Sequence, residues 1–117
     1  MNNKDRDLFR LGHIQDCIFK ISELVATCCT FENFDNKWVE QDAMIRNFEI
    51  IGEAANHIST ETKENFNQVE WHKIRGMRNF MTHEYFGIRV QTIWDTAVDD
   101  IPKLKILIDN IVSELEK

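Results

Sequence analysis

The sequence predicts an all-α protein folded as a bundle of helices. Apolar residues recur at three- and four-residue steps over long stretches, the spacing that places side chains on one face of a helix. The 117 residues include one proline and four glycines, so few positions interrupt a helix. No stretch alternates apolar and polar residues over the length of a strand. A chain of this length forms one domain around one core, and we assign residues 1–117 to it.

The first half of the chain is expected to form two long helices joined by an irregular stretch. The first helix is expected from about Asp5 to Ala26, where the apolar spacing is regular. Its apolar residues are Leu8, Leu11, Ile14, Ile18, Ile21 and Val25. Thr27–Asp35 breaks the pattern, so we expect a loop anchored by two phenylalanines. The second helix is expected from about Asn36 to Ile58.

The second half is expected to form three further helices. Ser59–Gln68 is polar, which predicts a loop with room for one helical turn. The third helix begins near Val69, and Gly87 is a stop signal just past its end. A fourth helix spans about Val90 to Asp99, and Pro102 suits the first turn of a fifth. Together the helices predict a mostly antiparallel bundle.

The charge of the chain is acidic overall but unevenly distributed. The net charge is −6, which argues against a nucleic-acid partner. Between His72 and Arg89, however, there are four basic residues and one acidic residue, hence a local charge of +3. This basic island is either a solvated helix face or a contact surface for an anionic ligand.

The sequence also indicates a compartment. No apolar run approaches the roughly 20 residues of a membrane span, and the polar N-terminus does not resemble a secretory signal. The cysteines are Cys17, Cys28 and Cys29, an odd number without a C-x-x-C pair. We therefore expect a cytoplasmic protein with reduced thiols and no membrane partner.

One short stretch concentrates the chemistry of the basic island. Arg78, Asn79, His83 and Tyr85 lie within eight consecutive residues, RNFMTHEY. On a helix, Arg78 and His83 are about 140° apart around the axis. They converge on one ligand only because arginine is long, or because a second copy of the helix faces the first. The spacing therefore indicates a homodimer with a shared cleft.

These side chains suit metal-independent RNA cleavage. Histidine has an ordinary pKa of about 6.5 and can transfer the protons of the 2′-hydroxyl and the leaving 5′-oxygen. Arginine binds two phosphate oxygens at once and keeps its charge. Asn79 could fix the tautomer of His83 or hold a phosphate oxygen. The alternative is an ordinary helix surface, with Arg78 exposed and His83 half-buried.

A polar stripe on the second helix offers support for such a site. Asp42, Arg46, Glu49, Glu53 and Asn56 are spaced by three or four residues and share one face. The stripe either forms intrahelical ion pairs or lines the Arg78–His83 site, where Arg46, Glu49 and Glu53 would support its basic groups. A carboxylate metal site is a third alternative. No His-x-x-x-His or Glu-x-x-His pair gives the stripe metal-ligand spacing, so we expect no metal.

Two blocks of the sequence resemble the HepT-like family of HEPN domains. The first, AMIRNFEIIGEA, covers residues 43–54, and the second, R-N-x-x-x-H-x-Y, covers residues 78–85. Trp71 and Trp94 accompany them, and the resemblance extends from about Arg6 to Leu115. It implies an all-α, HEPN-type antiparallel bundle of four to five helices that forms a homodimer with its cleft on the two-fold axis.

The resemblance also implies an activity and its control. The activity would be that of a metal-independent endoribonuclease without a cofactor, the toxin of a prokaryotic toxin–antitoxin pair. By position, Arg78 and His83 would be the catalytic pair, and Asn79 and Arg75 would contact RNA phosphate. Tyr85 would accept AMP from ATP, transferred by a small nucleotidyltransferase that is the antitoxin partner.

Two other functions stay open on the sequence alone. In the first, the HEPN fold is a non-catalytic partner of the nucleotidyltransferase that binds a nucleotide or a protein, and Arg78 holds ATP phosphate. The acidic net charge favours this alternative, because it weakens long-range attraction for RNA. In the second, the protein is a structural dimer without chemistry at these residues.

Overall fold

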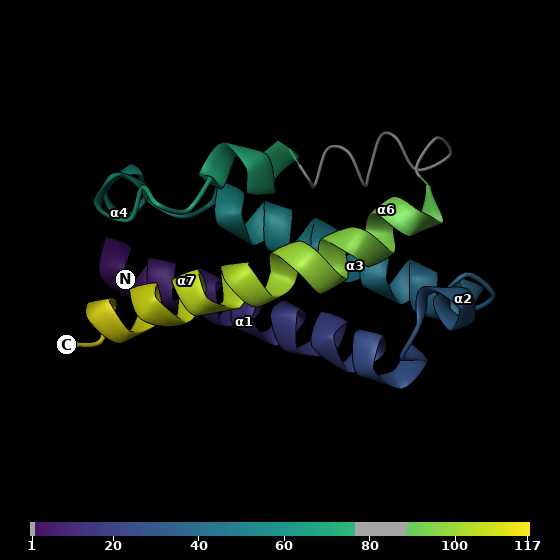
Figure 1. Ribbon diagram of the computed structural model, residues 1–117. Coiled ribbons are helices and arrows are strands. Elements are labelled where there is room, and N and C mark those ends of the chain that lie inside the picture. Colours follow the sequence, from purple (N-terminus) through teal and green to yellow (C-terminus); the bar gives the residue numbers. More distant parts are fainter. Residues whose placement is uncertain (1, 77–88) are drawn as a thin grey trace.

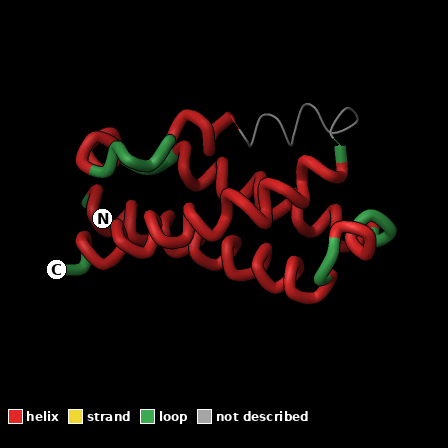
Figure 2. The backbone as a smooth tube through the Cα atoms, viewed as in Figure 1, coloured by secondary structure: helices red, strands yellow, loops and turns green. Residues whose placement is uncertain are grey.

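A computed structural model describes residues 2–76 and 89–117, and every regular element in these ranges is helical. Figure 2 shows helices joined by short loops throughout the described part of the chain. The all-α prediction is therefore confirmed. None of the helices described combines the length and apolar character that a membrane crossing requires.

Three long helical segments form the body of the bundle. They are α1 (Asn3–Cys28), α3 (Trp38–Asn56) and a rod made of α6 (Val90–Asp95), η2 (Thr96–Asp100) and α7 (Ile101–Leu115). Figure 1 shows α3 and the rod alongside α1, both running in the opposite direction to it. The antiparallel arrangement agrees with the prediction, and it brings the two ends of the chain to the same end of the bundle.

Helix α1 follows the apolar periodicity closely. Its buried apolar side chains are Leu11, Ile14, Cys17, Ile18, Ile21 and Cys28. At the start, the Asn2 side chain accepts the Asp5 backbone N–H at 2.8 Å. At the end, Cys29 adopts a positive φ of 68° and donates its N–H to the Val25 carbonyl at 2.9 Å. The helix is thus two residues longer at each end than the expected Asp5–Ala26.

Two short helices occupy stretches where loops are expected. Within Thr27–Asp35, α2 (Phe31–Phe34) forms one turn, and the Thr30 hydroxyl caps it by accepting the Asn33 N–H at 3.2 Å. Within Ser59–Gln68, α4 (Thr60–Asn65) is the single helical turn for which the prediction left room. Residues 71–76 are also helical, close to the expected start at Val69, and the expected stop at Gly87 lies outside the described residues.

The expected break between Asp99 and Pro102 is wrong. The chain stays helical from Val90 to Leu115, and residues 96–100 take the wider π-helical turn. There the Ile101 N–H bonds to the Thr96 carbonyl, five residues earlier. Pro102 comes directly after Ile101 and has no backbone N–H to donate. The π-helical hydrogen-bond pattern just before it lets the rod continue past this position.

The core lies between α1, α3 and the rod. Its fully enclosed side chains are Phe34, Phe48, Leu11, Ile14, Ile21, Met44, Ile51, Ile93, Ile101, Ile108 and Ile111. The rings of Phe34 and Trp94 pack with centroids 5.1 Å apart, which fastens α2 to the rod.

Candidate functional site

The residues predicted to carry the chemistry fall into two groups. Arg78, Asn79, His83 and Tyr85 lie outside the described residues. Those that the structure does describe line two depressions on the molecular surface, one between α1 and α3 and one beside α4.

The first depression contains three residues of the predicted polar stripe. Arg46, Glu49 and Glu53 line a groove of about 350 Å³, together with Arg10 and His13 of α1. Arg46 and Glu53 are exposed and Glu49 is half-buried. The apolar residues between them, Ile45, Phe48 and Ile51, are buried in the core, as the helical spacing predicts.

One contact on the stripe fits the intrahelical interpretation. The His57 Nε2 and Glu53 Oε1 atoms are 3.1 Å apart, one helical turn from each other. Both side chains are nearly half exposed, so with a protonated imidazole such a pair contributes only about 0.3–0.5 kcal/mol. Whether the stripe also supports Arg78 and His83 stays a prediction, because those residues lie outside the described ranges.

Helix α1 supplies a basic part of this face that was not predicted from the sequence. Arg6 and Arg10 are one helical turn apart and, with Phe9 and His57, line a hollow of about 450 Å³. Phe9 is 56% exposed, and its ring packs on His13 with centroids 4.5 Å apart. The four-residue spacing of the two arginines was the signal in the sequence for this basic surface.

The second depression contains Arg75, the predicted phosphate contact. It has a volume of about 310 Å³ and is lined by Lys63, Asn67, Val69, Trp71, His72 and Arg75. His72 and Arg75 are three residues apart on helical residues 71–76, and both are exposed. Burial lowers the pKa of the half-buried Lys63, the charge of Arg75 lowers it further, and the charge of Asp7 acts in the opposite direction.

A buried carboxylate fixes the position of α4 and hence of Lys63. Asp7 of α1 is 1% exposed. Its Oδ1 accepts the Ser59 N–H at 2.9 Å, and its Oδ2 accepts the hydroxyls of Ser59 and Thr62, each at 2.6 Å. Thr62 directly precedes Lys63. We refer to Asp7, Ser59 and Thr62 as the Asp7 anchor.

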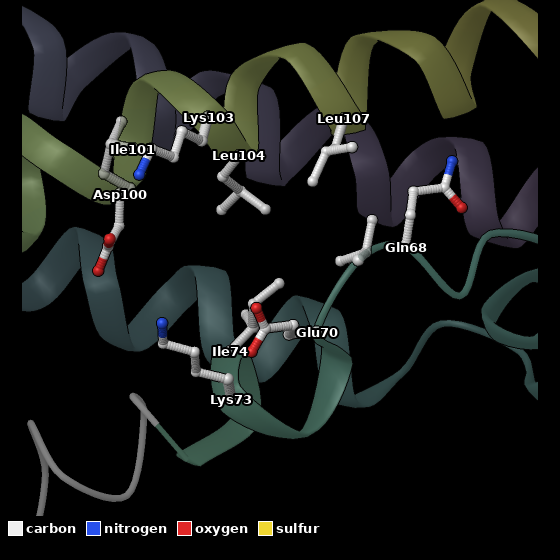
Figure 3. A pocket seen from close by; sticks show the side chains of 10 residues that line it. Gln68, Glu70, Lys73, Ile74, Asp100, Ile101, Lys103, Leu104 and Leu107 are labelled. Atoms are coloured by element: carbon white, nitrogen blue, oxygen red, sulfur yellow. The ribbon is translucent and has the colours of Figure 1, made fainter.

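A fourth depression is apolar and unsuited to an anion. It lies between residues 68–74 and α7 and has a volume of about 120 Å³. Figure 3 shows Ile74, Ile101, Leu104 and Leu107 around it, with charged side chains at its edges. The cavity is smaller than the roughly 300–1,000 Å³ of ligand pockets, so it is a packing gap under residues 71–76.

Within the described ranges, no three His, Cys, Asp or Glu side chains are grouped so that they could hold a metal ion.

Comparison with known proteins identifies a family and several relatives that are similar to this chain. The family model described as "Ribonuclease HepT-like" matches residues 14–111. The chain is 37% identical over 105 residues to a protein of Caldanaerobacter subterraneus named "Putative RNase", covering 89% of this chain and 92% of the relative. It is 38% identical over 95 residues to "Probable ribonuclease HepT" of Thermococcus cleftensis, covering 81% and 86%.

A further relative is longer than this chain. The "Gamma-glutamylcyclotransferase and putative RNase" of Methanocaldococcus jannaschii is 37% identical over 107 residues, which cover 92% of this chain. The match spans only 48% of that relative, so the chain corresponds to about half of it. No solved structure matches the chain.

Proposed function

Because this chain belongs to the ribonuclease HepT-like family, we propose that it is a metal-independent endoribonuclease, the cytoplasmic toxin of a toxin–antitoxin pair. The match over residues 14–111 carries this proposal, since it includes both the α3 stripe and the R-N-x-x-x-H-x-Y block. The same match supports a single domain over residues 1–117. Two relatives named as ribonucleases are similar to the chain over most of their own length.

In the proposed reaction, His83 and Arg78 act on one phosphodiester. A His83 imidazole takes the proton of the 2′-hydroxyl, and the 2′-oxygen attacks the adjacent phosphorus. The bond to the 5′-oxygen breaks, and that oxygen takes a proton from a histidine, which leaves a 2′,3′-cyclic phosphate and a 5′-hydroxyl. Arg78 stabilises the charge on the phosphorane. Asn79 orients His83 or a phosphate oxygen, and Arg75 binds a neighbouring phosphate.

A homodimer completes the proposed site. The angle of about 140° between Arg78 and His83 on a helix separates them unless two chains share the cleft. The α3 stripe would then support the site through Arg46, Glu49 and Glu53, which line a groove and are not in the core.

Control is proposed to act at Tyr85. The partner nucleotidyltransferase transfers AMP from ATP to the Tyr85 hydroxyl and releases pyrophosphate. The new phosphodiester charge repels RNA and occupies Arg78 in its place. We expect Tyr85→Phe to abolish AMP incorporation and to leave the ribonuclease active in the presence of the partner. If the partner still blocked the variant to the same degree, covalent modification would be the wrong mechanism.

The test of the activity is cleavage of single-stranded RNA by purified protein in EDTA. We expect His83→Ala to reduce the rate about 10²- to 10⁴-fold, the contribution of a proton-transfer group. The control is Lys20→Ala, which removes an exposed basic residue of α1 that lines none of the three basic depressions. Equal rates for His83→Ala and the wild type would refute the assignment.

The acidic net charge of −6 favours a second candidate, a non-catalytic partner of the nucleotidyltransferase that binds ATP through Arg78. Tight ATP binding without RNA cleavage by the wild-type protein would establish it over the ribonuclease.

A further inference from the structure

The depression beside α4 gathers basic side chains from two separate elements. Lys63 comes from the last turn of α4, whereas His72 and Arg75 come from one face of helical residues 71–76. Asn67, Val69 and Trp71 complete the lining. Its volume of about 310 Å³ is large enough for a phosphate group and part of an attached nucleoside.

Lys63, His72 and Arg75 line one depression, and Asp7 is a described carboxylate whose charge acts on Lys63. Among residues 2–76 and 89–117, none of the ion pairs includes Lys63, His72 or Arg75. The nearby carboxylate of Asp7 already accepts three hydrogen bonds from Ser59 and Thr62. Burial and the charge of Arg75 both disfavour the charged form of Lys63 and lower its pKa. Like charges held together in this way cost stability until an anion lies between them.

The walls of this depression are held in place before any ligand arrives. The Asp7 anchor fixes α4 on α1 and thereby the backbone that carries Lys63. The Trp71 indole N–H donates to the Phe66 carbonyl at 3.1 Å, which fixes the plane of the ring. A site that is already assembled loses less conformational entropy on binding than one that must be ordered.

We propose that Lys63, His72 and Arg75 form a phosphate-binding site that receives a phosphodiester of single-stranded RNA, with Trp71 available to stack a base. The choice of RNA rests on the proposed ribonuclease function. It is favoured by the exposure of His72 and Arg75, which lets a strand continue past the site, and by the aromatic wall beside the cations. Arg75 also precedes the proposed catalytic Arg78 by only three residues in the sequence.

The binding test uses an RNA oligonucleotide with 2′-O-methyl groups, which lacks the attacking hydroxyl and is not cleaved. We expect Lys63→Gln to weaken its binding, measured by fluorescence anisotropy, roughly five- to tenfold, the net effect of one hydrogen bond of ordinary strength. The dependence of log K on log salt concentration should fall by about one. Lys20→Gln, which removes an exposed lysine of α1 outside the depression, should change neither quantity. Unchanged binding by Lys63→Gln would overturn the proposal.

Competition distinguishes the possible sources of phosphate. We expect ATP and inorganic phosphate to displace the oligonucleotide only weakly. If Lys63→Gln lost ATP binding and bound RNA as the wild type does, the site would be a nucleotide site, and the assignment to RNA would be wrong. Because these measurements need no cleavage, an inactive wild-type protein would refute the ribonuclease and leave the binding result intact.

A stability measurement shows whether Lys63→Gln merely damages the fold. In buffer of low ionic strength without phosphate, the variant should melt at the same or a higher temperature than the wild type. Removing the charge relieves its desolvation and its repulsion with Arg75, which together outweigh the lost attraction to Asp7. Added phosphate should raise the melting temperature of the wild type more than that of the variant. A variant that melted lower and responded to phosphate as much as the wild type does would contradict the site.

Discussion

Replacing Asp7 with alanine is expected to lower the free energy of unfolding by about 3 kcal/mol. The Asp7 carboxylate is 1% exposed and accepts hydrogen bonds from the Ser59 N–H and from the hydroxyls of Ser59 and Thr62. Each hydrogen bond to a charged group contributes about 1.5–3 kcal/mol. Alanine removes all three and leaves the buried Thr62 hydroxyl without its acceptor.

Part of this loss is offset. Taking a carboxylate out of water costs several kcal/mol, and the alanine variant no longer bears that cost. The half-buried Ser59 can also exchange its lost partner for water. The net value of about 3 kcal/mol corresponds to a fall of roughly 10 °C in melting temperature for a domain of this size.

Urea unfolding followed by circular dichroism at 222 nm measures the change. Protein concentration is held constant, because a dimer would make stability depend on it. The control is Asp16→Ala, which removes an exposed carboxylate from the same helix and should change stability by less than about 0.5 kcal/mol. If Asp7→Ala cost no more than this control, the Asp7 anchor would not hold α4 as described.

Two further variants test the core and one surface contact. Phe48→Ala, at a fully enclosed position, should cost about 3–5 kcal/mol in urea unfolding, and a cost below about 1 kcal/mol would contradict its place in the core. The hydrogen bond from Lys105, with a second from Gln15, holds the pKa of Asp109 below its ordinary value of 3.8. This lowered pKa stabilises the fold above pH 3.8, and the stability is lost as the pH falls through the folded value. Asp109→Asn should therefore lower the free energy of unfolding by up to about 1 kcal/mol at pH 7 and by progressively less below pH 3.8. If the difference between the wild type and the variant stayed constant down to pH 2, the lowered pKa of Asp109 would not be the source of this stability.

The sequence predicts the long helices well and the short ones poorly. The bounds of α1 and α3 fall within two residues of the expected ones, because each contains several repeats of the apolar spacing. A single turn such as α2 or α4 is too short for any periodicity. In both cases the available signal was the preceding hydroxyl, Thr30 or Ser59, which caps the helix that follows it. Pro102 suggested a boundary between two helices, but the rod continues past it through the π-helical turn at Thr96–Asp100.

The basic site beside α4 could be predicted only in part. Arg75 lies in the basic island, which was visible as a local excess of charge. Lys63 lies among glutamates in a polar stretch, where its own charge gives no signal. The Asp7 anchor brings Lys63 to Arg75. It joins Asp7 to Ser59 and Thr62, which follow it by 52 and 55 positions in the chain. A single sequence shows the spacing of residues along a helix, but it does not show such distant polar partners.

The length of α4 has a consequence for the order in which the protein folds and opens. An isolated helix of six residues is not stable in water, so α4 can form only after α1 supplies Asp7. We therefore expect its amides to exchange with deuterium faster than those of α1, α3 and α7, through local openings that leave the bundle intact. Lys63 would leave the basic site during each opening. An anion that bridges Lys63 and Arg75 should slow this exchange. The exchange rate of the α4 amides would therefore show whether the site is occupied.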